Sequence, residues 1–562
     1  MWKVLSTIVA DQITFLTENH QLLPKNHFGG HPGQTTTNAM HLLTLRIKAA
    51  WCVGKVAAVL FLDIKGAFPN AVPERLVHNL RQRRIPRKYS NFVGKMLHGR
   101  VTSLKFNGYM SAPIHINNSI GQGDPLSMVL YQYYNTDLLD IPSNKDKDAM
   151  AFVDNLFMLA IADTFAKAHK ILADMMGREG SIAEWTSTHN FPLEYSKLAL
   201  IDIAHCQSQK SRTLLQLPQR VVKLATSTKY LGVFFDQNLN WKAQQAHTIK
   251  KGTQWAAQIR WIMKQTWGIM PKYVRQLYIS VALPRTLYAI DLWCTPMQSE
   301  HPGPRAIGSA KAMKQLTTLQ HAAAIVIMGG LWTSPTDALN TCTFLLLAWL
   351  NINKHCHMVL TRMAMLPEDH PLHSTIKRKN TCKVKYYHTA LHHLLDQYQN
   401  SIDPTKIEKI PATSHNPICE VKNPFTISIP KDKESLTKEA ENAEEEVQVF
   451  LDRLAMKGKV GAAAVLLRAD KPTCILYFHL GLEEEHTVHK AELVGILLGI
   501  YLINMERRNG TTFGLGSDNQ VAIKVFQSNL RSPGHYLARE VLRIAHQIHH
   551  RKRKTKYILM LR

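Results

Sequence analysis

The stretch FLDIKGAFPN, residues 61–70, continues an apolar run and ends that run on a carboxylate, Asp63. A short apolar run of this kind is typical of a buried β-strand, so the pattern predicts a strand that carries Asp63 at its exposed tip. A second apolar run, residues 149–153, ends in the same way on Asp154, and polar Asn155 follows it. Two acids presented by neighbouring strands can hold divalent metals about 3.5–4 Å apart. Such a pair can activate an attacking 3′-hydroxyl and stabilise a leaving pyrophosphate.

A glycine-containing loop, GQGDPLS at residues 121–127, lies between the two acids in the sequence. Its two glycines allow a close approach of the backbone, and Pro125 favours a helix that starts just beyond it. A loop that leads into a helix suits the binding of a nucleotide or a template base. A Gly-x-Gly pair alone is a common turn, so the loop gains weight only in combination with the two acids.

These three motifs together resemble the palm motifs of reverse transcriptases from non-LTR (LINE-type) retrotransposons. Further stretches are similar to other elements of that family: FGGHPGQTTTNAMHLL at 28–43, PLEYSK at 192–197 and KYLGV at 229–233. The resemblance covers about residues 1–340.

The resemblance implies a set of site residues. The implied metal ligands are Asp63, the backbone carbonyl of Ile64, Asp154 and Asn155, with Asp63 and Asp154 catalytic. The implied nucleotide- and template-binding residues are Phe68, Gly121, Gln122, Gly123 and Lys197. In this family Phe68 would lie under the sugar as a gate against ribonucleotides, and Lys197 would be a candidate general acid near the triphosphate.

The chain also departs from the family pattern. Asn155 stands where the family has a second Asp, which removes one negative charge and weakens the hold on hard cations. His31, Gln34 and Asn38 replace residues that are usually Arg, Arg and Asp. The sequence starts just after the point where the family's basic fingers strand is expected. Three interpretations stay open: an active polymerase with ribonuclease H, a chain that keeps one activity, more plausibly the polymerase, and a catalytically dead nucleic-acid-binding remnant.

A second set of acids lies near the C-terminus. Asp452 ends a predicted strand, Glu492 opens a predicted helix, and Asp518 follows a later strand, at separations of 40 and 26 residues. Acids on a strand, a helix and a strand can converge on a two-metal site that cuts phosphodiesters. The predicted order of elements over 447–550, three strands, a helix, a strand and two helices, indicates a mixed α/β domain.

This layout resembles the type 1 ribonuclease H domain, through KGKVGAAAVLL (457–467), HKAELVGILLGI (489–500) and GSDNQVAIK (516–524). The resemblance implies that Asp452, Glu492 and Asp518 are catalytic metal ligands, with two Mg²⁺ or Mn²⁺ expected at each of the two sites. Arg453 and Leu454 stand where relatives have Gly and Ser. The sequence stops before the family's last histidine and fourth carboxylate, so a partial domain is expected.

The predicted fold class is therefore multi-domain, α+β and α/β: a right-hand polymerase palm with a helical thumb, plus a partial ribonuclease H-like α/β domain. Recurring prolines and a charged run predict a linker between them. The predicted domains are a fingers remnant and palm at 1–240, a thumb-like helical segment at 241–300, a helical connection at 301–399, a linker at 400–445 and a partial ribonuclease H-like domain at 446–562.

Composition supports a polyanionic partner. The 562 residues include 68 Lys and Arg against 42 Asp and Glu, a net charge of +26. The predicted partners are an RNA template, a DNA primer, an RNA–DNA hybrid and dNTPs. No membrane is predicted, since apolar runs such as Leu493–Ile503 are shorter than the roughly 18 residues needed to span one. Eight cysteines without a Cys-x-x-Cys pair predict an intracellular protein, nuclear or cytoplasmic and not secreted.

Other charged and metal-type residues have plainer explanations. The run His355-Cys356-His357 and the pair Cys382 and His388 match no zinc-site spacing, and three consecutive residues of a helix cannot all point at one metal. The basic run 551–554 is either a hybrid contact, a nuclear signal or a basic helix end. Thumb cations can follow duplex phosphates or form a solvated face: Lys250, Lys251, Arg260, Lys264 and Lys272.

Overall fold

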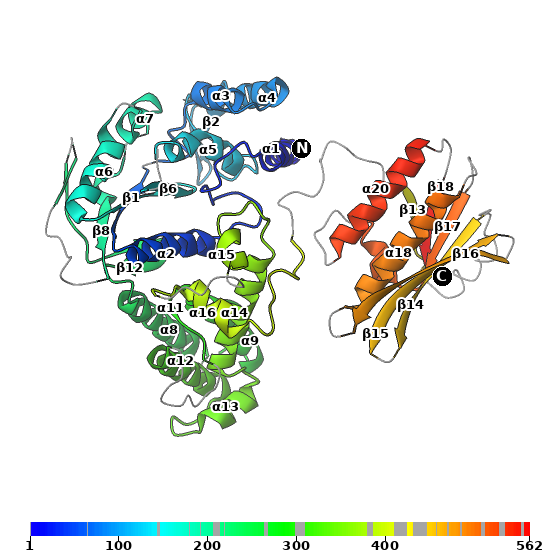
Figure 1. Ribbon diagram of the computed structural model, residues 1–562. Helices are drawn as coiled ribbons and strands as arrows, with labels where there is room; N and C mark the ends of the chain where they lie inside the picture. Colours follow the sequence, from blue (N-terminus) through cyan, green and yellow to red (C-terminus); the bar gives the residue numbers. More distant parts are fainter. Residues whose placement is uncertain are drawn as a thin grey trace. The chain divides into compact units, whose positions relative to one another are not determined.

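The computed structural model divides the chain into two compact units, residues 1–414 and 415–562, and each is described by itself (Figure 1). The division falls inside the segment predicted as a linker. The structure describes residues 2–561 apart from 65, 143–145, 179, 192, 206–213, 218–219, 264–267, 298–308, 379–385, 410–423, 431–446, 457, 469–470, 484–485, 507–511, 528–533 and 552–555. Lys264, Cys382 and most of the basic run 551–554 therefore lie outside the described residues.

A mixed sheet-and-helix core forms the centre of the N-terminal unit. Its largest described sheet has the order β6-β7-β1-β8, and β1 pairs antiparallel with both neighbours. Alternate residues of β1 enter two different hydrophobic clusters, because successive side chains of a strand point to opposite faces. Helix α6 packs on one face and α2 on the other. The bounds are β1 Val56–Asp63, β6 Lys147–Phe152, β7 Asn155–Ala162, β8 Ala199–Ile203, α2 Thr36–Cys52 and α6 Phe165–Gly177.

Shorter elements surround this sheet. A helix pair, α3 and α4, leads into a ribbon of four short strands, and α5 follows the glycine-containing loop (Figure 1). The bounds are α1 Trp2–His20, α3 Pro73–Gln82, α4 Arg87–Leu97, β2 Arg100–Thr102, β3 Lys105–Phe106, β4 Tyr109–Met110, β5 Ile114–Ile116, α5 Ser127–Asn135, a 3₁₀ turn Thr136–Leu139, α7 Ile182–Thr188, a 3₁₀ turn Tyr195–Lys197, β9 Leu215–Gln216, β10 Val221–Val222, β11 Ser227–Tyr230 and β12 Val233–Asp236.

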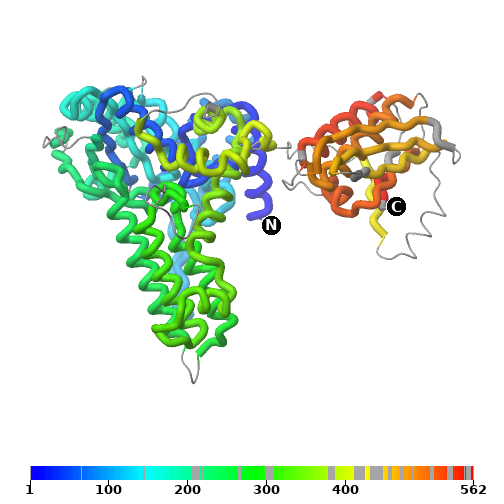
Figure 2. The backbone as a smooth tube through the Cα atoms, turned by 60° about the horizontal axis from the view of Figure 1, so that its bottom comes forward, coloured from blue at the N-terminus to red at the C-terminus, as the bar shows by residue number. Residues whose placement is uncertain are grey.

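The rest of the N-terminal unit is helical, and its longer helices extend away from the sheet (Figure 2). Helices α8 and α12 pack closely: a Cβ on Gly252 would lie 2.5 Å from a methyl of Leu319, so a larger residue there would make the Leu319 side chain move. The bounds are α8 Lys242–Ile262, α9 Pro271–Leu277, a π-helical turn Tyr278–Ala282, α10 Leu283–Thr286, α11 Ile290–Trp293, α12 Ala310–Met328, α13 Thr336–Thr343, α14 Ala348–Ala364, α15 His373–Arg378 and α16 Ala390–Gln397.

The C-terminal unit is one sheet with helices packed on it (Figure 1). The described strands follow the order β13-β18-β17-β14-β15-β16; β14, β15 and β16 are antiparallel, and the remaining pairs are parallel. The bounds are β13 Phe425–Ser428, β14 Val447–Met456, β15 Lys459–Arg468, β16 Lys471–Leu482, α18 Val488–Met505, β17 Thr512–Ser517, α19 Gln520–Lys524, α20 His535–Arg551 and β18 Lys556–Leu561.

Two strands of this sheet differ from the sequence prediction. The order β14 to α20 follows the predicted order, but β18 adds a strand after the last predicted helix. Strand β13 lies inside the predicted linker 400–445 and pairs parallel with β18, more than 100 residues further on. Local patterns cannot indicate such a pairing, because a four-residue strand gains its partner only in the folded chain.

Helix α18, with 18 residues, extends beyond the apolar run 493–503 at both ends. Among the described helices it is the one whose length and composition would allow it to cross a membrane. Ten of its residues are buried in the C-terminal unit, where it packs on the sheet and on α20. A buried core helix has the same length and apolar composition as a membrane-spanning helix, so these two properties alone do not distinguish them.

Candidate active sites

Asp154 lies at the tip of a tight hairpin. Strands β6 and β7 are joined by two residues, Val153 and Asp154, since Phe152 pairs directly with Asn155. Val153 has φ 58°, a left-handed conformation that is rare for a β-branched residue and costs roughly 1–2 kcal/mol. A residue stays in such a conformation only where its surroundings hold it there.

The surroundings of this turn come from α5 and from the glycine-rich segment near residue 28. The Asn135 side-chain amide donates to the Val153 carbonyl at 2.7 Å. The Phe28 N–H donates to the Ala151 carbonyl at 2.8 Å. A Cβ on Gly29 would collide with the Val153 backbone and lie 2.7 Å from its methyl group. Glycine at position 29 therefore allows the turn that presents Asp154.

Asp63 and Asp154 face the same region. The last residue of β1, Asp63, pairs with Asn155, the residue after Asp154. The Asn155 amide donates to an Asp154 carboxylate oxygen at 2.9 Å. Burial raises the pKa of the Tyr131 phenol, and the carboxylates of Asp154 and Asp63 raise it further. Tyr131 thus lies within electrostatic range of both acids, so the structure brings the two predicted acids and Asn155 together.

Lys197 contacts one of these acids directly. Its ammonium lies 2.7 Å from an Asp63 carboxylate oxygen and 3.8 Å from Glu194. The hydrogen bond to Asp63 raises the pKa of Lys197, and Glu194 adds to this. The backbone holds the arrangement, because the Glu194 N–H donates to the Asp63 carbonyl at 3.1 Å and Ile64 forms a bridge with Leu193.

The Phe68 loop and the glycine-containing loop are hydrogen-bonded neighbours. The Ile120 N–H donates to the Phe68 carbonyl at 2.9 Å, directly before Gly121. The Phe68 ring stacks on Tyr131, with 5.0 Å between centroids and 30° between planes. Gly123 has φ 81°, which requires glycine or a strained residue, and Gln122 is exposed. The Phe68 ring therefore contacts Tyr131, the residue whose pKa both acids raise, and the glycine-containing loop adjoins Phe68 through the backbone.

Several supporting residues were not found from the sequence. Tyr131, Asn135 and Glu194 each contact or approach a predicted site residue. The sequence offers a signal for the first two, since both follow the glycine-containing loop on one short, aromatic-rich helix. Glu194 carries no signal of its own, because its role depends on where Lys197 lies.

The C-terminal acids also converge, around a buried carboxyl group. Glu492 is 2% exposed. The pKa of Glu492 is raised to about 7, first by burial and then by the charges of Asp518 and Asp452, against the lowering effect of Arg453. Arg453 lies 3.6 Å from one Glu492 oxygen, and the other oxygen has no hydrogen-bond partner among the described residues. Arg453 thus supplies positive charge beside the carboxyl group.

The donor chemistry of both sites suits a hard divalent cation, although no group of three or more His, Cys, Asp or Glu in the described part of the chain is gathered tightly enough to hold a metal by itself. At the C-terminal site the unpartnered Glu492 oxygen and the mutual repulsion of three acids both favour added positive charge. At the N-terminal site the residues that fit are Asp63 and Asp154, with the Asn155 amide.

The residues weighed as a zinc site point in different directions. His355 lies 3.9 Å from buried Asp291, and the His357 ring packs edge-on against Tyr398. Cys356 is buried, and burial raises the pKa of its thiol. Of the five cations predicted for a thumb, Lys250 and Lys251 lower the pKa of His247, as Lys229 does, although burial lowers it most.

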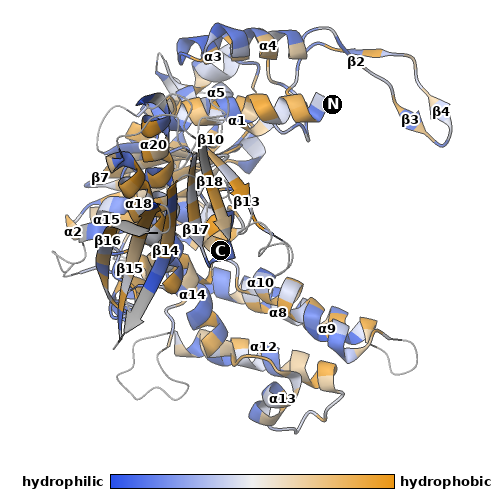
Figure 3. Cartoon of the chain, turned by 90° about the vertical axis from the view of Figure 1, so that its right-hand side faces the viewer, coloured by the Kyte–Doolittle hydropathy of each residue, from blue (hydrophilic) through white to orange (hydrophobic). Residues whose placement is uncertain are grey.

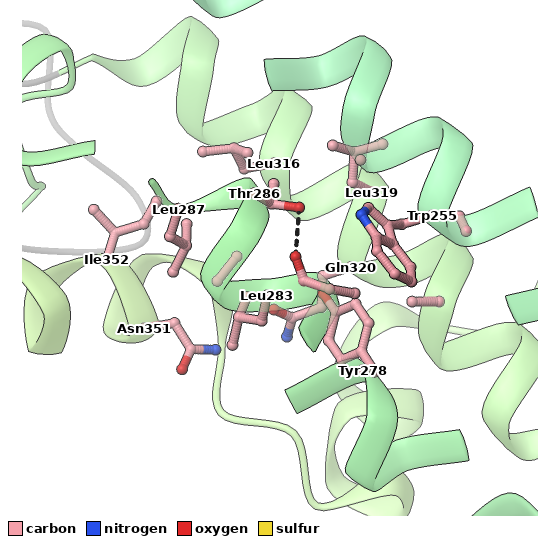
Figure 4. Close-up of a pocket in the computed structure, with 15 residues that line it drawn as sticks. Trp255, Tyr278, Leu283, Thr286, Leu287, Leu316, Leu319, Gln320, Asn351 and Ile352 are labelled. Carbon is pink, nitrogen blue, oxygen red and sulfur yellow. Dashed lines mark hydrogen bonds between the residues drawn. The ribbon is translucent and has the colours of Figure 1, made fainter. Parts of the chain in front are cut away.

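A cavity among the helices is too small to be a substrate site. It lies between α8, α10, α12 and α14, lined by Trp255, Tyr278 and Leu283 among others (Figure 4). Its volume of about 30 Å³ leaves room for no more than one or two waters. The Thr286 hydroxyl at its edge donates a hydrogen bond to the Ala282 carbonyl at 2.8 Å.

The curated proteins that this chain resembles are RNA-directed DNA polymerases of mobile elements. No family model matches the chain. It is 20% identical over 324 residues to a probable RNA-directed DNA polymerase from transposon BS of Drosophila melanogaster, covering 56% of this chain and 35% of the relative. It is 22% identical over 357 residues to the corresponding protein of the X-element from the same organism, covering 63% and 37%.

A solved structure, the RNase H1 of the archaeon Halobacterium salinarum, matches 21% of this chain and 84% of its own at 13% identity, with a TM-score of 0.17. The chain is a homologue of the RNA-directed DNA polymerases of non-LTR retrotransposons. It spans about a third of the length of these curated relatives.

Proposed function

We propose that the chain is a retrotransposon RNA-directed DNA polymerase that also carries a ribonuclease H domain. The observation that carries the polymerase assignment is the placement of Asp63 at a strand end opposite the hairpin that bears Asp154. The Phe68 loop and the Gly121–Gly123 loop adjoin through the backbone, and the Phe68 ring stacks on Tyr131. In this proposal the sheet around β1 is the palm, and the helices from α8 onward are the thumb and connection.

Each residue of the first site has a proposed role. Asp63 and Asp154 would hold the divalent cations, Mg²⁺ or Mn²⁺, which when bound activate the primer 3′-hydroxyl and neutralise charge on the phosphates. Lys197 is exposed enough to leave Asp63 and to give a proton to the departing pyrophosphate. Phe68, fixed by its stack on Tyr131, would exclude a nucleotide with a 2′-hydroxyl.

The proposed partners are an RNA template, a DNA primer, an RNA–DNA hybrid and dNTPs. The net charge of +26 supports a polyanionic partner. Lys250 and Lys251 on α8 and Lys229 on β11 supply positive charge near His247. An intracellular location, nuclear or cytoplasmic, stays a prediction from the cysteine pattern.

In the C-terminal unit we propose hydrolysis of RNA in an RNA–DNA hybrid. Asp452, Glu492 and Asp518 are the proposed cation ligands, and the convergence of their charges supports this role. Arg453 stands beside Glu492 and would have to move, or share the carboxyl group, when a cation binds.

Primer extension on an RNA template tests the polymerase proposal. The purified chain should extend a DNA primer with dNTPs and Mg²⁺ or Mn²⁺, and Asp63→Ala should not. Asp163→Ala is the matched control, because Asp163 is an exposed acid that pairs with Lys167 away from this site. No extension by a folded chain with either cation would contradict the proposal and favour a nucleic-acid-binding remnant. Cleavage of a labelled hybrid, absent in Asp518→Asn, tests the ribonuclease H proposal in the same way.

A further inference from the structure

A two-stranded ribbon projects from the N-terminal unit after α4 (Figure 3). Its strands pair as β2 with β5 and β3 with β4, and Phe106 lies opposite Tyr109. The two residues between them, Asn107 and Gly108, have φ 43° and 83°, as the tight Asn-Gly hairpin turn requires. The sequence itself therefore specifies this ribbon.

The ribbon exposes an unusual number of large apolar side chains. Phe106 is 73% and Tyr109 67% exposed, and directly paired residues of a ribbon lie on the same face. The further exposed members are Val101, Leu104, Met110 and Ile114. A two-stranded ribbon is marginally stable alone, and clustered exposed apolar side chains mark interaction sites.

The stretch of sequence that contains the ribbon is basic and lacks acids. No Asp or Glu occurs from residue 75 to residue 123, whereas Lys and Arg occur at nine positions: Arg75, Arg81, Arg83, Arg84, Arg87, Lys88, Lys95, Arg100 and Lys105. Of these, Arg83 is paired with Asp137 and Asp140. Arg84 is exposed in the turn between α3 and α4, and Arg87 and Lys95 are exposed on α4. Positive charge beside exposed aromatic rings is complementary to a nucleic acid strand rather than to an apolar protein surface.

The base of the ribbon is joined to the candidate nucleotide site. Arg100 donates to the carbonyl of Ser119, and the Ser119 N–H donates to the Ala71 carbonyl at 2.8 Å. The next residue, Ile120, donates to the Phe68 carbonyl. The start of the ribbon is therefore tied by hydrogen bonds to the loop that carries Phe68.

We propose that the ribbon, together with α3 and α4, binds single-stranded nucleic acid. Phe106 and Tyr109 stack on unpaired bases, and the cations of α3 and α4 contact the backbone phosphates. Only the identity of that strand as the template rests on the proposed polymerase function; the binding itself does not.

Fluorescence anisotropy with a labelled single-stranded RNA of about 20 nucleotides tests this, in EDTA and without dNTPs. The double substitution Phe106→Ala/Tyr109→Ala should weaken binding about tenfold or more, with an unchanged salt dependence. The variant Trp332→Ala is the matched control, because Trp332 is a separate aromatic that is 82% exposed. In contrast, Arg84→Ala/Arg87→Ala should lower the slope of log K against log salt by about 1.4.

Three results would overturn the proposal. The first is an unchanged affinity in the aromatic variant, and the second is an equal loss of affinity in Trp332→Ala. The third is an equal loss of affinity by the aromatic variant for a blunt RNA duplex. An unchanged affinity would assign the ribbon to a protein partner instead. Because no cation or nucleotide is present, an inactive chain can still pass this test, and an active polymerase can fail it. The two proposals are therefore separable.

Discussion

The two acid sites differ in how their charges are balanced. At the N-terminal site Asp63 is paired with Lys197 at 2.7 Å, and Asp154 accepts a hydrogen bond from Asn155. At the C-terminal site buried Glu492 faces two further acids, with Arg453 at 3.6 Å, and its pKa is raised to about 7. Carboxyl groups are thus paired with a lysine and an amide in the N-terminal site, whereas in the C-terminal site three of them share one arginine. The second site should therefore respond more strongly to added cations.

The largest expected effect concerns Asp518, the charged residue that changes the pKa of Glu492 most. Asp518→Asn should lower hybrid cleavage by about a thousandfold, because several kcal/mol of cation-dependent stabilisation are lost. The same change should lower the pKa of Glu492, since Asp518 raises it. Cleavage kinetics and an NMR titration of the Glu492 carboxyl group measure the two effects. An unchanged pKa would mean that the acids do not converge.

Gly29→Ala tests how the first site is held. The new methyl group collides with the Val153 turn, so we expect the N-terminal unit to lose about 2–3 kcal/mol of unfolding free energy and the polymerase to slow. Gly94→Ala is the control, because Gly94 lies inside α4, where alanine should be neutral or stabilising. Its Cβ would lie an ordinary 3.4 Å from a methyl of Val77 in α3. Denaturant unfolding separates them, and equal stability of both variants would contradict the account.

Glu492→Gln tests the charge imbalance of the second site. The folded pKa of about 7 lies above the usual 4.5, so between these values the folded state binds more protons and stability falls as pH rises. The substitution removes this penalty, and we expect a gain of about 1–3 kcal/mol at pH 8 and none at pH 4. Exposed Glu483→Gln is the control. A gain of equal size at both pH values would refute the explanation.

Asn155→Asp tests the charge balance of the N-terminal site by adding a negative charge to it. A third carboxylate strengthens the hold on hard cations, so primer extension in limiting Mg²⁺ should rise by about tenfold. It should rise less in saturating Mg²⁺, because only cation affinity changes. Steady-state rates across a Mg²⁺ titration measure this. A lower rate at every concentration would show that the Asn155 amide, through its bond to Asp154, is the better arrangement.

The sequence predicted those features that local patterns encode. The apolar run before Asp63 is β1, and the run before Asp154 is β6 with its turn. Features that depend on distant residues could not be predicted: the left-handed Val153 is held by Asn135 and Gly29, and Lys197 reaches Asp63 across more than 100 residues. The β13–β18 pairing is of the same kind. Such contacts exist only in the folded chain, so no single stretch carries their pattern.

The central claim is that Asp63 and Asp154 act as one centre, and a double-mutant comparison of primer extension tests it most directly. Residues that act as a unit have non-additive effects. Asp63→Asn and Asp154→Asn should each slow extension by about a thousandfold. The double variant should be no slower than the slower single variant. If the two losses instead multiply in folded protein, the acids act independently and the account is contradicted.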